Sequence, residues 1–108
     1  MGRVEGKTPK TGVTIRFLTP ASNELTESIA YYEEQRLGLG FEFLAEVETA
    51  IEKISDFPNA WTRVSDRTRR ILVKRFPFGL LYEVRKNELT IAAVMDLRRD
   101  PAHWQHLM

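Results

Sequence analysis

The sequence predicts an α+β domain in which an antiparallel α-helical hairpin packs on a small antiparallel β-sheet, with the elements in the order β-α-α-β-β-β. Two observations predict it. Two amphipathic helix patterns follow one another across a short glycine-containing break, and three strand-like runs joined by short connectors fill the second half. A chain of 108 residues suits one such domain and leaves no room for a second core of useful size.

The first element is a strand over 13–18, where apolar and polar side chains alternate and β-branched and aromatic types are frequent. A helix over about 20–36 follows it. Thr19 is expected to cap this helix with its hydroxyl, and Pro20 then occupies the first helical position, where its missing N–H has no consequence.

Both predicted helices carry an apolar stripe. In the first, the apolar positions recur at i, i+4 and i+7: Leu25, Ile29 and Tyr32. Its carboxylates are expected to face solvent: Glu24, Glu27, Glu33 and Glu34. The second helix, over about 41–56, follows the break at Gly38-Leu39-Gly40 and ends at Phe57-Pro58. Its stripe is broad: Phe43, Leu44, Val47, Ala50, Ile51 and Ile54. The short connection predicts an antiparallel hairpin that needs a common partner surface.

That surface is a predicted meander of strands over 70–76, 80–85 and 89–96. The connectors Pro77-Phe78-Gly79 and Lys86-Asn87-Glu88 are short enough for hairpins. We expect the strand over 13–18 to join one edge of this meander.

Both faces of the sheet carry apolar residues. Leu80, Tyr82 and Val84 share one face, and Leu81 lies on the other with Glu83 and Arg85. In the last strand Leu89, Ile91, Ala93 and Met95 are expected on the face opposite to Thr90, Ala92, Val94 and Asp96. Two helices shield one face only, so the other is either a partner-binding surface or is closed by the C-terminal turn and the loop around Trp61.

Composition excludes several classes of function. The chain has no cysteine, which excludes a disulfide scaffold and thiolate chemistry, and its two histidines argue against a structural zinc site. We expect no cofactor and no metal. The formal net charge of +1 gives no whole-molecule argument for nucleic-acid binding, so such a case needs local clustering.

The ends of the chain differ from the middle. Residues 1–12 are polar, without the apolar run of a secretory signal or membrane span, and are expected to form a flexible tail before a single domain over 13–108. A cytoplasmic protein without a membrane partner is therefore expected. Asp100-Pro101 has the pattern of a helix start and predicts a short turn that carries His103 and Trp104.

Several separated blocks together resemble the RelE/ParE toxin superfamily. They are residues 31–44 (YYEEQRLGLGFEFL), Phe57-Pro58, residues 75–82 (RFPFGLLY) and residues 98–101 (RRDP) with Trp104. Their order and spacing match from about Val13 to Trp104. Each block alone is weak evidence for the superfamily, but the four blocks together are specific for it.

The resemblance implies the same fold and a cognate antitoxin whose extended and helical tail wraps the toxin in a hetero-oligomer. It also implies one of two targets. Members like RelE enter the ribosomal A site and cut mRNA with Lys, Arg and a Tyr or His, whereas members like ParE poison DNA gyrase. Many chains of this subgroup carry a His where this sequence has Asp96, which counts against the nuclease reading.

Candidate site residues follow from the chemistry. Cleavage of RNA through the 2′-hydroxyl needs an acid, a base and cations around the phosphate. The candidates for a nuclease are Arg75, Tyr82, Arg98, Arg99 and His103; those for partner binding are Arg70, Lys74, Arg75, Arg98, Arg99 and Trp104.

Each candidate has a simpler interpretation. The strand arginines are typical of solvated edge charges, and Trp104 of an anchor for the C-terminal turn. Arg98 and Arg99 either engage a phosphate or carboxylate of a partner or pair with Asp96, Asp100 or a helix glutamate. Asp100 is best explained as a helix cap.

The leading hypothesis is a ParE-like toxin of a type II toxin–antitoxin system, also known as a plasmid stabilisation protein. It inhibits growth by docking on a macromolecule, with DNA gyrase as the target that the resemblance implies. The alternatives are a ribosome-dependent mRNA endonuclease and an inactive member that only binds an antitoxin.

Overall fold

The computed structural model describes residues 13–99. Its elements are β1 (Thr14–Phe17), α1 (Thr19–Gln35), α2 (Leu39–Asp56), β2 (Thr62–Arg63), β3 (Arg69–Leu72), β4 (Phe78–Arg85) and β5 (Glu88–Asp96). The expected tail over 1–12 and the turn that starts at Asp100-Pro101, with His103 and Trp104, lie outside the described residues.

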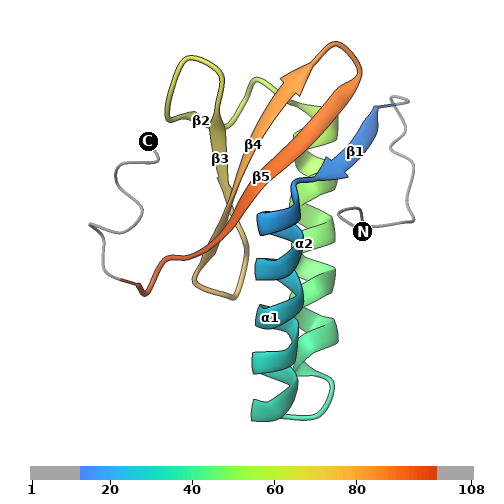
Figure 1. The fold of residues 1–108 in the computed structure, drawn as a ribbon, viewed down its shortest axis with the longest axis vertical. Helices are drawn as coiled ribbons and strands as arrows, with labels where there is room; N and C mark the ends of the chain where they lie inside the picture. The colour runs from blue at the N-terminus through green and yellow to red at the C-terminus, as the bar shows by residue number, and fades with distance from the viewer. Residues whose placement is uncertain (1–12, 100–108) are drawn as a thin grey trace.

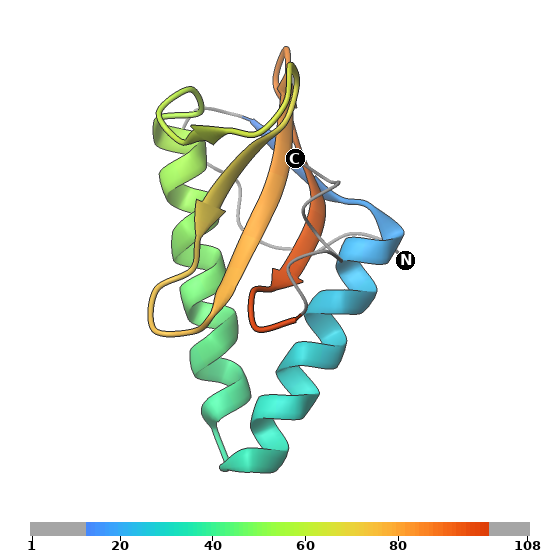
Figure 2. The same cartoon turned by 90° about the vertical axis from the view of Figure 1, so that its left-hand side faces the viewer.

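The strands form one sheet in the order β1-β5-β4-β3-β2, and both helices lie on the same face of it (Figures 1 and 2). The meander of β3, β4 and β5 is antiparallel as predicted, and β1 joins its edge. The sheet is mixed rather than purely antiparallel, because β1 runs parallel to β5. Parallel neighbours need a long connection, and here it contains the helical hairpin and the strands β2, β3 and β4. The short strand β2 was not predicted.

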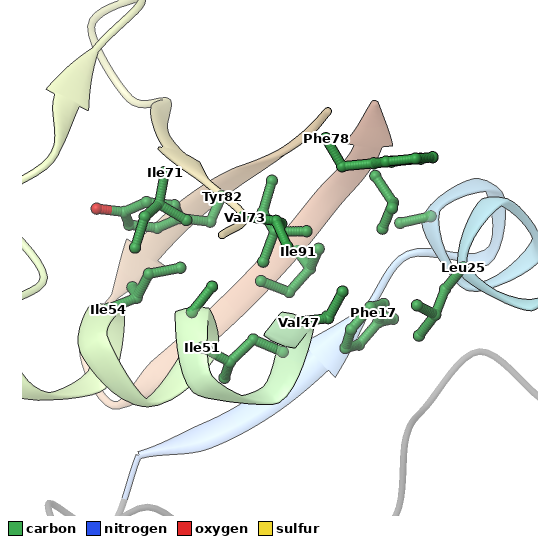
Figure 3. Packing of buried hydrophobic residues seen from close by; sticks show 14 of the residues in the cluster. Phe17, Leu25, Val47, Ile51, Ile54, Ile71, Val73, Phe78, Tyr82 and Ile91 are labelled. Atoms are coloured by element: carbon green, nitrogen blue, oxygen red, sulfur yellow. The ribbon is translucent and has the colours of Figure 1, made fainter. Parts of the chain in front are cut away.

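The core lies between the helical hairpin and the sheet (Figure 3). Every residue of the predicted α2 stripe is buried except Leu44, which is half-buried and packs against the core. From the sheet, Leu80, Tyr82 and Ile91 are fully buried against this stripe. The helical periodicity therefore predicted the packing face of α2 correctly.

The start of α1 differs from the prediction. The helix begins at Thr19, Leu18 occupies the cap position with extended backbone, and no side chain caps the first turn. The first helical hydrogen bond runs from the Ser22 N–H to the Leu18 carbonyl at 2.9 Å. Pro20 still lies in the first turn, where its missing N–H leaves nothing unpaired. The cap assigned to Thr19 is wrong because the helix starts one residue earlier.

A β-bulge changes the faces of β5. Leu81 pairs with Ala93 but Tyr82 pairs with Ile91, so Ala92 is an extra residue in the strand. Beyond the bulge Val94 faces the helices and Ala93 faces away, the reverse of simple alternation. The predicted faces are therefore correct for Leu89 and Ile91 and wrong from Ala93 onwards.

The β3–β4 connection begins earlier than predicted. β3 ends at Leu72, and Arg75 adopts a left-handed backbone with φ 71°. The Phe78 N–H donates to the Phe76 carbonyl at 2.8 Å, which tightens the chain around Pro77. Lys74 and Arg75 therefore lie in a loop, where strand alternation does not decide their direction.

The sheet face away from the helices carries Leu81 and Met95, which are both buried. The loop around Trp61 does not close this face. Trp61 packs against the helix-side core and its indole N–H donates to the Lys53 carbonyl at 3.4 Å.

Candidate partner-binding site

A groove of about 440 Å³ runs along the outer edge of β5 beside α1. Its lining combines apolar surface from Phe78, Met95 and Tyr31 with the charges of Glu24, Arg98 and Arg99. Two regular elements form its walls, so its shape is fixed by the fold. The groove lining includes the last residues of β5, the two arginines that follow it, and side chains of α1.

The edge of β5 is only partly covered. β1 pairs with β5 as far as Ile91, and among residues 13–99 no strand lies outside the stretch from 92 to 96. Here the Val94 N–H donates to the Glu24 carboxylate at 2.8 Å. The expectation that Glu24 faces solvent is therefore wrong, because an edge N–H needs an acceptor and the side chain of Glu24 reaches it. Such an edge can accept an extended segment of another chain.

Glu33 also has a structural role that the sequence did not predict. Its carboxylate accepts hydrogen bonds from the Gly38 N–H at 2.8 Å and the Gly40 N–H at 3.0 Å. These N–H groups belong to the start of α2, where the first turn leaves amides without helical acceptors. Glu33 therefore caps α2 from the end of α1 and fixes the hairpin.

Arg98 is held within the chain. Its guanidinium donates to both carboxylate oxygens of Asp96, at 2.9 and 2.8 Å, and lies 5.6 Å from the centre of the Tyr31 ring. These charge-assisted bonds lower the pKa of Asp96 and raise the pKa of Arg98. The intramolecular pair with Asp96 is thus confirmed for Arg98, whose side chain stays half-exposed.

Arg99 lies next to this pair at the exposed end of the groove. Within the described part of the chain no carboxylate forms an ion pair with it. The backbone N–H of Arg99 donates to the Asp96 carbonyl at 3.2 Å. This bond fixes the turn but does not involve the guanidinium. Arg99 can therefore meet an anionic group of another molecule.

A buried aromatic cluster lies behind the groove. The Tyr32 ring contacts Phe43, Phe76 and Phe78 with centroids 5.2, 4.9 and 6.0 Å away. The Tyr32 hydroxyl is buried and has no hydrogen-bond partner among residues 13–99. Burial raises the pKa of Tyr32, because the charged form would lose its hydration. The neighbouring Tyr31 is exposed and lines the groove, as expected for two adjacent helix positions.

The other described cations among the candidate residues lie apart from the groove. Arg75 donates to the Glu42 carboxylate at 2.7 Å and pairs with Glu46 at 3.6 Å, which ties the β3–β4 loop to α2. Hydrogen bonds from Arg75, and then from Arg36, lower the pKa of Glu42. Lys74 is exposed in the same loop. Arg70 is half-buried, and its side chain lies across Gly79 on the sheet face away from the helices.

Tyr82 belongs to the core. Its side chain is fully buried, its hydroxyl donates to the Pro58 carbonyl at 2.8 Å, and burial raises its pKa to about 12. In the sheet, Phe78 pairs with Asp96, and Tyr82 lies four residues further along β4. At the rise of a strand this is about 13 Å.

The structure therefore does not bring Arg75, Tyr82 and Arg98 together. Arg75 contacts α2, Tyr82 lies in the core near Pro58, and Arg98 lies at the end of β5. His103 and Trp104 are outside the described residues.

Two limited observations concern other site types. Among residues 13–99, no cluster of histidine, aspartate and glutamate side chains could hold a metal ion. In the same part of the chain, neither helix has the length and hydropathy to cross a membrane.

One comparison with known proteins shows the family of this chain. The family described as ParE toxin of type II toxin-antitoxin system, parDE, matches residues 15–101. One similar solved structure is described as the chromosomal ParDE TA system from P. aeruginosa; it has a TM-score of 0.68 and 15% identity, and the match covers 79% of this chain and 96% of that chain. At this identity it shows a shared fold. No curated protein matches. Since the family match spans most of the sequence, this chain belongs to the ParE toxin family of type II toxin–antitoxin systems.

Proposed function

We propose that this chain is the growth-inhibiting toxin of a type II pair, which acts in the cytoplasm by docking on a macromolecular target and carries out no covalent chemistry itself. DNA gyrase is the target that the resemblance to ParE favours. A cognate antitoxin neutralises the chain by binding it.

One observation carries the docking proposal: the described residues suited to nuclease chemistry are separated and engaged in contacts of their own. Tyr82 is the described tyrosine assigned to proton transfer, yet its hydroxyl is bound to Pro58 and its pKa is raised to about 12. A general acid or base works best with a pKa near the operating pH and within reach of the reacting atom. Arg75 and Arg98 already bind carboxylates of this chain.

Exposed apolar side chains support a docking role for the helical hairpin. At its tip, Leu37 is 87% exposed and Phe41 is 72% exposed. Both lie beside the ion pair of Arg36 with Glu42, so the tip combines apolar and charged groups. Interfaces often centre on such aromatic and aliphatic anchors within a polar rim. We assign the tip to the target.

The β5 groove is the second proposed surface, and we assign it to the antitoxin. An extended antitoxin segment would pair with the edge of β5 between residues 92 and 96 by displacing Glu24 from the Val94 N–H, and its carboxylates would bind Arg99. The apolar groove wall of Phe78 and Met95 would take its apolar side chains. This leaves the hairpin tip and the antitoxin groove as separate surfaces.

Growth on induced expression tests the proposal. The wild-type chain should arrest growth, and co-expression of the antitoxin encoded beside it should restore growth. Tyr82→Phe combined with Arg98→Ala should keep the arrest, because neither group performs chemistry. Leu37→Ser combined with Phe41→Ser should abolish it, because a docked interface loses its anchors.

The control is Leu72→Ser, which removes an apolar side chain that is 58% exposed on β3, away from the tip. It should arrest growth like the wild type, with soluble protein levels and thermal melting recorded for every variant. Loss of arrest in the Tyr82 and Arg98 pair with retention in the tip pair would favour the endonuclease instead. Normal growth with abundant, folded wild-type chain would favour an inactive antitoxin-binding member.

A further inference from the structure

A second cavity, of about 350 Å³, lies at the other end of the sheet from Arg98. Its walls come from the segment after α2, the turn between β2 and β3, and the end of β4. Figure 1 shows the β2–β3 connection at the upper left and the end of β5 at the lower left. We call this cavity the arginine recess, and its size lies within the range of small-ligand pockets.

Positive charge is concentrated in the recess. Four arginines line it, against two carboxylates, in a chain whose formal net charge is only +1. The arginines are Arg63, Arg67, Arg69 and Arg85, and the carboxylates are Asp66 and Glu83. None of these arginines belongs to the candidate residues of the sequence analysis, although Arg67 and Arg69 lie within three residues of Arg70 in a basic run. The recess is thus a local cationic site that the net charge hides.

Two of the arginines are positioned without being neutralised. Arg69 donates to the Trp61 carbonyl at 2.8 Å. Arg63 donates to the carbonyls of Ser65 and Asp66, both at 3.3 Å. A carbonyl orients a guanidinium but cancels none of its charge, and each guanidinium has five N–H donors. Both groups therefore keep donors for a bound anion.

The other two arginines have little competition from within the chain. Arg85 pairs with Glu83 at 3.5 Å, but both side chains are substantially exposed, so the pair is weak in water. Arg67 is exposed and forms no ion pair with a carboxylate in the described part of the chain. Both Arg67 and Arg85 are therefore available to bind an anion in the recess.

The turn that carries these residues is held in shape by its own hydrogen bonds. The Val64 and Ser65 N–H groups donate to the Thr68 carbonyl at 2.9 and 3.2 Å, and the Thr68 N–H donates to the Ser65 hydroxyl at 3.2 Å. The Tyr82 hydroxyl, bound to Pro58, closes the recess on the core side. A recess formed in advance loses less conformational entropy when a ligand binds.

We propose that the arginine recess binds a phosphate group carried by a nucleotide or by a nucleic-acid strand. A carboxylate is matched by a single bidentate guanidinium. A terminal phosphate offers more charge and more acceptor oxygens, and a strand offers several successive phosphates, so several guanidinium groups can bind either ligand together. The excess of arginines over carboxylates in the recess fits the phosphate. This site is distinct from the hairpin tip and from the β5 groove, and it does not depend on toxicity.

Binding to the purified full-length chain tests the proposal. The probes are inorganic phosphate, adenosine 5′-monophosphate, a ten-nucleotide single-stranded DNA, and a polyglutamate peptide. Backbone amide shifts in NMR locate each probe, and calorimetry measures its affinity. We expect the phosphate-bearing probes to shift the amides of the β2–β3 turn. Binding of the mononucleotide would identify a nucleotide site, and binding of the oligonucleotide alone would identify a strand site.

The decisive variants change charge equally inside and outside the recess. Arg67→Gln with Arg85→Gln should weaken the bound phosphate probe at least about tenfold, since two charged contacts are lost. Lys74→Gln with Arg16→Gln removes the same charge outside the recess and outside the β5 groove, and should leave the affinity within about twofold. All four side chains are exposed, so the variants keep the fold. Equal loss in both pairs, no binding by any phosphate probe, or binding of the polyglutamate peptide alone would overturn the proposal.

Discussion

Replacing Phe43 by alanine is expected to lower the free energy of unfolding by about 3–5 kcal/mol. Phe43 is fully buried in α2, and its ring centroid lies 5.1 Å from that of Phe76 and 4.8 Å from that of Phe78. The substitution removes apolar contacts and leaves a cavity between α2 and the β3–β4 segment, which the neighbouring rings can fill only in part. Equilibrium urea denaturation followed by circular dichroism measures the loss.

The matched control is Tyr32→Phe in the same cluster. It keeps the aromatic ring and removes a buried hydroxyl that has no hydrogen-bond partner in the described part of the chain. Stability should stay the same or rise by about 1 kcal/mol, because the cost of burying that hydroxyl disappears. A loss below about 1 kcal/mol for Phe43→Ala would show that this cluster does not join the hairpin to the sheet.

Gly40→Ala should destabilise the chain by about 1–3 kcal/mol, although alanine normally favours a helix. A Cβ at this position would lie 2.6 Å from the Ile29 carbonyl oxygen and 3.0 Å from a Glu33 carboxylate oxygen. The first contact is with backbone, so α1 and α2 would have to move apart. Thermal unfolding and the amide signals of the hairpin in NMR would both report this separation.

Gly79→Ala provides the comparison. Its added Cβ would meet Arg70 and Ile71 atoms no closer than 3.6 Å, which is ordinary van der Waals contact. This variant should melt close to the wild type, or slightly higher, since glycine is unfavourable within a strand. Similar losses at Gly40 and Gly79 would contradict the close crossing of the two helices.

Most of the fold could be predicted because it depends on periodicity. The stripes of α1 and α2, the glycine break and the alternation in β4 are local patterns that burial must satisfy. What failed depends on how two strands pair and on the path of one loop. The bulge at Ala92 places Val94, and not Ala93, on the helix side of β5. β3 ends at Leu72, before the loop in which Arg75 adopts a left-handed backbone. No local pattern indicates either feature.

The candidate site was harder to predict for a related reason. Arg98 and Arg99 stand out as a pair in the sequence, and the alternative partner Asp96 was visible beside them. In contrast, Glu24 looked like one of several solvated helix glutamates, and only the sheet shows that it meets the Val94 N–H across the fold. The basic run near Arg67 was visible, but its meaning required the cavity formed with β4.

Purified DNA gyrase tests the proposed docking most directly. In a supercoiling assay with relaxed plasmid and ATP, added wild-type chain should inhibit supercoiling in proportion to its concentration. The chain with Leu37→Ser and Phe41→Ser should not inhibit, and the chain with Tyr82→Phe and Arg98→Ala should inhibit like the wild type. Unchanged supercoiling at saturating wild-type chain, together with new 5′ ends in mRNA on ribosomes treated with the same preparation, would contradict the account.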